Sequence, residues 1–387
     1  MIFYRRNILK LAHLTALALG VLSSILSAEG AQSSPTIVLF LENGLSGLQT
    51  SPCFTNWRHQ LAEEGLTTQV ILTPIETTAD QYVATLNSIG KTSRLWGSML
   101  IGNIDLPEVN LDVYDVSYDA NHNQVYTPAI RKVQTILPLL IPSTSLNDPA
   151  FYRKLAIYTH LEAGVISDGK SGRSTAERIQ NYCSYFERNM AYRTCSHATK
   201  KLSIVTYTDK AEPTWREWQN EMSEGEKSIL SFRRLSNLSE MQTINNHADP
   251  IDYFQILEHS DAVRHVTPSG DVTVEDVAKW QPAVRFYNLY ACSAGEYIDR
   301  PNLAQTYLFT RDTLGVYAST RPGSIPVPGL SKMYEDLTDY DDVTLGGAFD
   351  DMQASSYDPT QQQWEREVKA GVILYGDPTL KIYHCQK

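Results

Sequence analysis

Short apolar runs alternate along this chain with segments whose apolar positions recur at helical spacing. The runs have strand length and are followed by turn residues such as Asn43-Gly44 and Pro74, which is typical of buried strands. Alternation of this kind predicts an α/β fold with mostly parallel sheets flanked by helices. The predicted strands are 36–41, 66–73, 95–101, 202–207, 252–261 and the first part of 284–296.

Helix starts are marked by capping boxes, in which a Ser or Thr is followed three residues later by Gln or Glu. One box begins at Thr78, before an apolar face of Tyr82, Leu86 and Ile89, and another begins at Ser174. Proline and glycine signals predict a helix from Asp148-Pro149 to Gly164, and an edge strand or a break over 133–141, where Pro138 interrupts the apolar run. The segment 115–126 is polar and has no clear period, so we expect a surface excursion there.

The chain of 387 residues is long enough for one large domain or for two coupled lobes. We predict two tandem α/β lobes, of which the first supports the fold and the second carries the chemistry. The predicted divisions are a signal peptide at 1–31, a first lobe at 36–164, a helical linker at 165–201 and a catalytic lobe at 202–385.

The N-terminus predicts export. Arg5, Arg6 and Lys10 precede the apolar run 14–26, and small residues at 27–31 form a cleavage site. The paired arginines also approach the twin-arginine pattern. An uncleaved anchor is the alternative, but the run is shorter than the ~20 residues of a membrane span. We therefore expect a periplasmic or extracellular protein with no stable membrane span after signal cleavage.

The net charge of −11, without a basic block, argues against nucleic acid as a partner. Zinc-type Cys/His spacings and Gly-rich phosphate loops are both missing from the sequence, so we expect neither a metal nor a cofactor.

Five cysteines are an odd number for an exported protein. If four form disulfides, one thiol remains, and Cys292 has the setting that suits reactivity. Cys183 with Cys195 is the candidate disulfide, and Cys53 with Cys385 would then join the two ends of the domain. The alternative is that all five are reduced and buried, because a free cysteine behaves as a small hydrophobic residue.

The chemistry is predicted where two strands end. The stretch 284–296 is a buried strand that stops at small residues around Cys292, and 252–261 is an apolar run that ends at His259. The separation of 292 − 259 = 33 residues is enough for a strand, a crossover and the next parallel strand. Both side chains would then lie at one edge of the sheet, as a candidate nucleophile and a candidate acid/base.

This order of motifs resembles the caspase-like cysteine peptidases, most closely their gingipain branch. Three segments strengthen the resemblance: 314–320 as the next core strand, Leu345-Gly346-Gly347-Ala348-Phe349 as the start of a late helix, and the Gly-Asp-Pro-Thr-Leu run at 376–380. The resemblance implies a caspase-like fold and a cysteine endopeptidase acting on a peptide or protein through Cys292 and His259. It also implies oxyanion donors at the backbone N–H groups of Cys292 and Ser260. The family usually has Gly at the position of Ser260.

Other interpretations stay open. A catalytically silent relative, serving as a secreted binding or assembly protein, is one, and Ser260 favours it. A serine hydrolase is another, because Ala291-Cys292-Ser293-Ala294-Gly295 has the shape of a nucleophile elbow centred on Ser293. That fold needs a histidine after the serine, and only His384 follows. His247 and His265 compete with His259, but we expect them in a turn and a loop.

Overall fold

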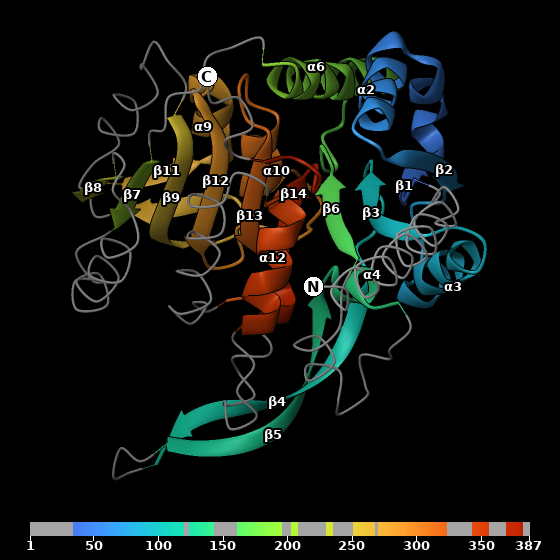
Figure 1. Cartoon of the computed structure of the whole chain (residues 1–387). Coiled ribbons are helices and arrows are strands. Elements are labelled where there is room, and N and C mark those ends of the chain that lie inside the picture. Colours follow the sequence, from blue (N-terminus) through green and yellow to red (C-terminus); the bar gives the residue numbers. More distant parts are fainter. Residues whose placement is uncertain are drawn as a thin grey trace, which may run out of the picture.

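A twelve-stranded sheet runs through the part of the chain that the computed structural model describes (Figure 1). The described residues are 34–119, 124–142, 161–195, 203–207, 230–234, 251–267, 270–322, 343–355 and 369–381. The main strand order is β11-β10-β9-β12-β13-β14-β6-β3-β1-β2, and β7 and β8 extend the sheet beyond β9. The strands are β1 (Thr36–Glu42), β2 (Thr67–Thr73), β3 (Leu95–Ile101), β6 (Glu162–Ile166), β7 (Ser203–Tyr207), β8 (Leu230–Arg234), β9 (Ile251–Ser260), β10 (Arg264–Thr267), β11 (Gly270–Thr273), β12 (Val284–Ala291), β13 (Gly315–Ser319) and β14 (Val372–Gly376).

Most of the sheet consists of two parallel blocks that run in opposite directions, and β10 and β11 form an antiparallel edge beside β9. In one block β9, β12 and β13 are parallel, and in the other β14, β6, β3, β1 and β2 are parallel. The blocks meet where β13 pairs with β14 in antiparallel fashion. The predicted mostly parallel α/β sheet is therefore confirmed. The predicted lobe boundaries stay a prediction. The division between residues 164 and 165 falls inside β6.

Helices cover both faces of this sheet. In Figure 1, α6 and α2 lie across the top of the view, and α12 lies in front of β13 and β14. The segment predicted as a linker therefore contributes α6 to the core, where its residues Tyr182, Tyr185 and Phe186 are buried. The helices are η1 (Asn43–Thr50), α2 (Pro52–Glu63), α3 (Ala79–Gly90), α4 (Leu137–Leu140), α6 (Thr175–Arg193), α9 (Val274–Trp280), α10 (Leu303–Leu308) and α12 (Leu345–Ser355).

The capping boxes begin the helices that they predict. Thr78 caps α3 and Ser174 caps α6, each with the reciprocal hydrogen bonds of the box. The predicted helix end at Gly164 is wrong, because this glycine lies inside β6. A Cβ at Gly164 would lie 2.4 Å from the carbonyl oxygen of Gly376, so its role is to let β6 approach β14 closely. The predicted start of that helix, at Asp148 and Pro149, lies outside the described residues.

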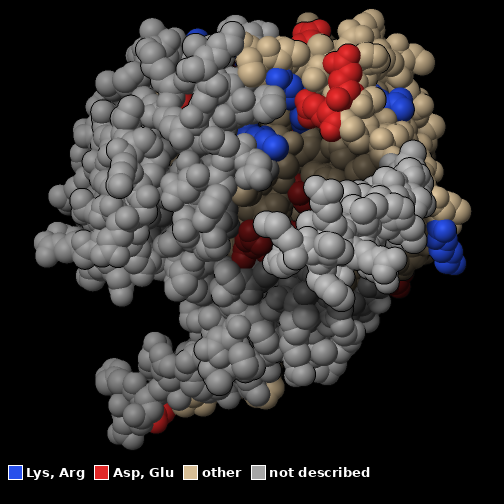
Figure 2. All heavy atoms as spheres, in the orientation of Figure 1, with Lys and Arg blue, Asp and Glu red and all other residues tan. Residues whose placement is uncertain are grey.

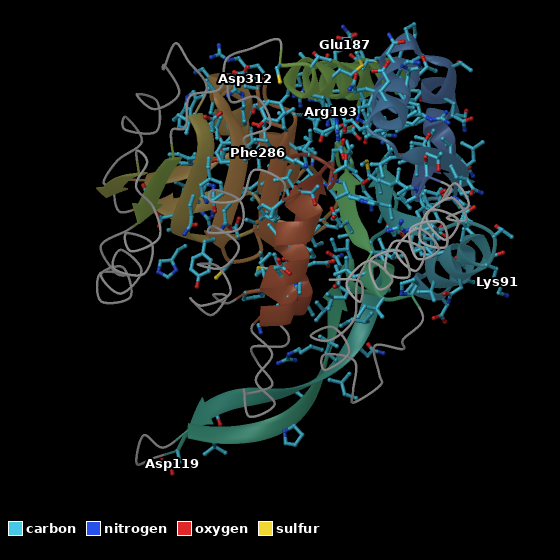
Figure 3. The ribbon with its side chains drawn as sticks, viewed as in Figure 1. Lys91, Asp119, Glu187, Arg193, Phe286 and Asp312 are labelled. Atoms are coloured by element: carbon cyan, nitrogen blue, oxygen red, sulfur yellow. A yellow bond between two sulfur atoms is a disulfide. The ribbon has the colours of Figure 1, made fainter. Side chains whose placement is uncertain are left out.

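The polar segment 115–126 belongs to a long hairpin of β4 (Glu108–Tyr118) and β5 (Gln124–Gln134). The hairpin extends away from the main sheet, with Asp119 near its tip (Figures 1 and 3). After β5 the chain turns into the short helix α4, where Pro138 lies in the first turn. The proline signal thus marks a break in the apolar run.

A disulfide joins α2 to α6. Cys53 and Cys183 are bonded, with an S–S distance of 2.02 Å, so the predicted pair Cys183–Cys195 is wrong. An α-helix rises about 1.5 Å per residue, which separates Cys183 from the end of α6 by much more than a disulfide can span. Cys195 is also disulfide-bonded, and Cys292 is not part of a disulfide.

A buried carboxylate follows β14 in the Gly-Asp-Pro run. One oxygen of Asp377 accepts hydrogen bonds from Trp57 Nε1 at 3.2 Å, Asn189 Nδ2 at 3.1 Å and Arg193 Nη2 at 2.7 Å. The other oxygen accepts from the backbone N–H and hydroxyl of Thr379. Arg193 lies at the end of α6, above the strands (Figure 3). Asp377 thus ties the end of β14 to α2 and α6.

The Gly-Gly start of α12 accommodates a second buried carboxyl group. Glu162 accepts a hydrogen bond from the Thr344 hydroxyl at 2.6 Å, and the same hydroxyl accepts from the N–H of Gly347 at 3.0 Å. A Cβ at Gly346 would lie 2.4 Å from Glu162 Oε2, so this position has no room for a side chain. Burial raises the pKa of Glu162 to about 8, so this carboxyl is protonated at neutral pH.

We expect Asp377→Asn to lower the free energy of unfolding by about 3 kcal/mol or more, because it removes a buried charged partner of Arg193. Burial alone would raise the pKa of Asp377, but Arg193 and Thr379 outweigh burial and lower it. A lowered pKa stabilises the fold above the unfolded pKa of about 3.9, and this contribution is lost as the pH falls through the folded pKa. Urea unfolding should therefore show a lower free energy of unfolding for Asp377→Asn than for the wild type at pH 7. This difference should shrink as the pH falls below about 4.

Asp299→Asn is the control, because Asp299 forms an exposed ion pair with Lys170 and its side chain is 97% exposed. Equal unfolding midpoints for the two variants at pH 7 would contradict the role given to Asp377.

Candidate active site

His259 and Cys292 lie at the ends of two strands that are parallel neighbours, as the 33-residue spacing predicts. In the register of β9 and β12, Leu257 faces Tyr290 and Glu258 faces Ala291. His259 is the next residue of β9, and Cys292 directly follows the end of β12. Register partners share a face of the sheet, so extending this register by one residue predicts the imidazole and the thiol on the same face. His259 is exposed and Cys292 is partly buried.

Two buried polar pairs fix this register. Asn288 Nδ2 donates to Gln255 Oε1 at 3.3 Å, and these two residues are direct partners in the ladder. Arg285 forms an ion pair with Asp252, and these residues directly follow Val284 and Ile251, the first pair of the same ladder. A slip by one residue would separate both pairs and leave a buried charge alone, which is costly.

Cys292 is the first residue of a tight turn that follows β12. Ser293, the residue after Cys292, has a φ of 51°, in the left-handed region that few side chains adopt. Its N–H donates to the carbonyl of Arg321 at 3.0 Å, and that of Gly295 donates to Ser319 at 2.8 Å. A Cβ at Gly295 would lie 3.1 Å from both Ala318 and Tyr375 atoms. The turn therefore packs closely against β13 and β14, which explains the small residues after Cys292.

Ser260 adds a contact between the two strand ends. Its hydroxyl donates to the carbonyl oxygen of Cys292 at 2.5 Å. The backbone φ of Ser260 is not positive. Serine in place of the family's glycine therefore causes no backbone strain here, and its side chain holds the end of β9 against the end of β12.

Glu258 is a residue of this site that the sequence analysis missed. Its side chain is buried, and one oxygen accepts a hydrogen bond from the N–H of His259 at 3.1 Å. The other oxygen has no hydrogen-bond partner among the residues that the structure describes. Burial raises the pKa of Glu258 to about 8, against the lowering effect of the His259 N–H, so the group is protonated at neutral pH. A glutamate inside an apolar strand, directly before the histidine, was the available signal.

The residues that were alternatives to His259 and Cys292 lie in different surroundings. His265 lies in β10, not in a loop as expected; it is buried, with Nε2 3.3 Å from the Tyr307 hydroxyl. Burial lowers the pKa of His265 to about 4, so it stays neutral and shielded. Ser293 is also buried. His247 and His384 lie outside the described residues.

Two carboxylates near His259 and Cys292 in sequence, Asp261 and Asp299, form ion pairs with basic side chains. Asp261 accepts from Arg264 Nε at 2.9 Å, and Asp299 accepts from Lys170 at 2.9 Å. On the described part of the face in Figure 2, acidic and basic side chains are interspersed without a continuous basic patch.

None of the described helices has both the length and the apolar character that a membrane span requires.

Comparison with solved structures identifies the fold. No protein-family model matches the chain, and no curated protein matches it in sequence. The crystal structure of the Arg-specific cysteine proteinase gingipain R (RgpB) matches with a TM-score of 0.61 and 13% identity, over 91% of this chain and 79% of that one. The complex of the Porphyromonas gingivalis RgpB pro- and mature domains matches with a TM-score of 0.60 and 13% identity, over 89% of this chain and 79% of that one.

A third structure, described as a protease, has a TM-score of 0.60 and 10% identity over 90% of this chain and 78% of that one. The caspase-like fold expected from the ordered motifs is thus confirmed, and the chain has the fold of the gingipain cysteine proteinases.

Proposed function

We propose that this chain is an exported cysteine endopeptidase that hydrolyses peptide bonds with Cys292 as nucleophile and His259 as acid/base. The observation that carries the proposal is the parallel pairing of β9 and β12, which brings the two residues to adjacent strand ends. Carboxyl ends of parallel strands are the common position of ligand and catalytic sites in α/β sheets.

In this mechanism the Cys292 thiolate attacks the peptide carbonyl and forms a tetrahedral intermediate. His259 protonates the leaving amine as the C–N bond breaks, which gives a thioester. His259 then takes a proton from water, whose oxygen attacks the thioester and releases the thiol and the acid. The groups named here suffice for hydrolysis, so the mechanism requires no cofactor.

Strand geometry supports Ser260 as an oxyanion donor alongside the N–H of Cys292. Backbone N–H groups point alternately to the two sides of a strand. The N–H of Asp261 donates to Arg264 on the β10 side at 3.1 Å. That of Ser260 is therefore directed to the opposite side, where Cys292 lies. A donor so placed contributes a few kcal/mol to acyl transfer by mutational precedent.

The two alternatives have less support. Ser260 was one reason for the silent-relative interpretation, and the absence of positive φ there means that the serine causes no backbone strain. The serine-hydrolase interpretation gains the left-handed φ of Ser293 but is opposed by the burial of that residue.

We expect Cys292→Ala to abolish peptide hydrolysis while the protein stays folded, because the change removes the nucleophile and little volume. Cys292→Ser is a second variant of matched size and should also lose nearly all activity. Ser293→Ala should retain activity within about tenfold, since this hydroxyl has no step in the mechanism. The measurement is cleavage of a peptide library, with circular dichroism as the check on folding. Retained activity in Cys292→Ala, with loss in Ser293→Ala, would favour the serine hydrolase.

We also propose that the protein is exported by its N-terminal segment. The disulfide between Cys53 and Cys183 and the disulfide-bonded state of Cys195 support this, because such bonds persist in oxidising compartments. N-terminal sequencing of periplasmic or secreted material should find a mature chain that begins between Glu29 and Ser33. A first residue of Met1 in that material would contradict cleavage.

A further inference from the structure

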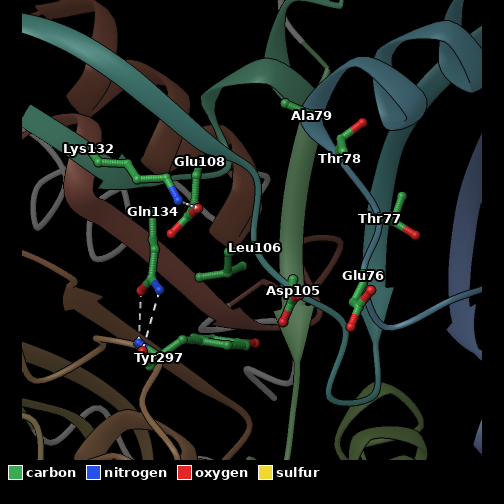
Figure 4. Close-up of a pocket in the computed structure, with 10 residues that line it drawn as sticks. All are labelled: Glu76, Thr77, Thr78, Ala79, Asp105, Leu106, Glu108, Lys132, Gln134 and Tyr297. Carbon is green, nitrogen blue, oxygen red and sulfur yellow. Dashed lines mark hydrogen bonds and ion pairs between the residues drawn. The ribbon is translucent and has the colours of Figure 1, made fainter.

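A pocket of about 420 Å³ lies away from the candidate active site, at the base of the β4–β5 hairpin (Figure 4). Its walls come from the segment before α3, the loop after β3, the two strands of the hairpin and the loop after β12. The volume is within the range of small-ligand sites, about 300–1,000 Å³. The lining residues are Glu76, Thr77, Thr78, Ala79, Asp105, Leu106, Glu108, Lys132, Gln134 and Tyr297.

The pocket has an excess of negative charge. Three carboxylates line it against one amine, and that amine, Lys132, is already paired with Glu108. Glu76 and Asp105 lie side by side in Figure 4, and neither has an ion-pair partner in the described part of the chain. Burial raises the pKa of Asp105, Lys170 opposes this, and Glu76 and Glu108 raise it further. Like charges held this close favour the arrival of a cation.

The other walls are apolar or neutral. Leu106 is buried, Ala79 is half-buried, and the ring of Tyr297 extends beneath Leu106 in Figure 4. Among the described residues the Tyr297 hydroxyl is buried and has no partner with full hydrogen-bond geometry. Burial raises the pKa of Tyr297, and the neighbouring Ser167 and Gln305 side chains oppose this. Gln134 holds the Tyr297 backbone with two hydrogen bonds, at 2.9 Å from its N–H and 3.3 Å to its carbonyl. The ring that closes the pocket is therefore fixed before any ligand binds.

We propose that this pocket binds a basic side chain of a peptide, with its ammonium or guanidinium group between Glu76 and Asp105 and its aliphatic stem against Leu106 and Tyr297. Lysine and arginine combine an apolar stem with a charged head, as these walls require. The Tyr297 hydroxyl would accept a hydrogen bond from the cation. A metal ion is the less suitable occupant, because no three His, Cys, Asp or Glu side chains among the described residues could hold one.

This site does not depend on the proposed peptidase activity. Tyr297 follows Cys292 by 297 − 292 = 5 residues, but the lining includes neither His259 nor Cys292. Binding can therefore be measured in Cys292→Ala, which removes turnover and leaves the pocket intact.

The test is calorimetric titration of full-length Cys292→Ala with Nα-acetyl-lysine amide, and with Nα-acetyl-norleucine amide as the probe without the amine. We expect saturable binding of the lysine probe only, weakening as the salt concentration rises. Adding Glu76→Gln and Asp105→Asn should weaken binding about tenfold or more, as expected for charge-assisted hydrogen bonds. Adding Lys132→Met should strengthen it, because Glu108 is then free for the ligand.

Asp312→Asn is the matched control, since this carboxylate is paired with Arg311 and lies outside the pocket. It should leave the affinity unchanged. Equal binding of the two probes, no binding of either, or an unchanged affinity in the Glu76/Asp105 variant would overturn the proposal. None of these outcomes bears on whether the wild-type chain cleaves peptides.

Discussion

The parallel pairing of β9 with β12 is the constraint on which the candidate site depends. Both strands are buried along most of their length, so packing on two faces opposes any slip. The pairs Asn288–Gln255 and Arg285–Asp252 add a polar constraint, because they meet in one register alone. Since side chains alternate between faces, a slip of one residue would direct His259 and Cys292 to opposite faces. The chemistry of the site is thus set by backbone pairing well inside the core.

The late part of the chain joins the two halves of the sheet. β14 lies between β13 and β6, antiparallel to one and parallel to the other. Asp377, at its end, gathers donors from α2 and α6, and the Cys53–Cys183 disulfide joins the same two helices. Each feature links segments far apart in sequence, so the two parallel blocks are held together through side chains as well as through the sheet.

Much of this fold could be predicted because its signals are local. Apolar runs such as 36–41 and 95–101 and the capping boxes at Thr78 and Ser174 report on their own neighbourhoods, and the structure has β1, β3, α3 and α6 there. The errors concern contacts between distant segments. Gly164 is a glycine because β14 approaches it, and Cys183 bonds to Cys53, 130 residues away. Neither of these two contacts can be predicted from the residues adjacent in sequence.

In the candidate site, too, local features could be predicted and contacts between distant segments could not. The strand ends at His259 and Cys292 follow from local pattern and spacing, and the resemblance to gingipains supplied their roles. The burial of Glu258 and the clamp from the Ser260 hydroxyl to the Cys292 carbonyl depend on three-dimensional packing. The pocket beside Tyr297 assembles from four separate segments, so no single stretch of sequence could have predicted it.

The most direct test of the central claim is the rate at which iodoacetamide alkylates Cys292 at pH 6.5, compared between the wild type and His259→Ala. An imidazole adjacent to the thiol should accept its proton and raise the thiolate fraction. The account predicts that the wild type reacts at least about tenfold faster, with the modification mapped to Cys292 by mass spectrometry. Equal rates in the two proteins would show that His259 does not act on the thiol and would contradict the dyad.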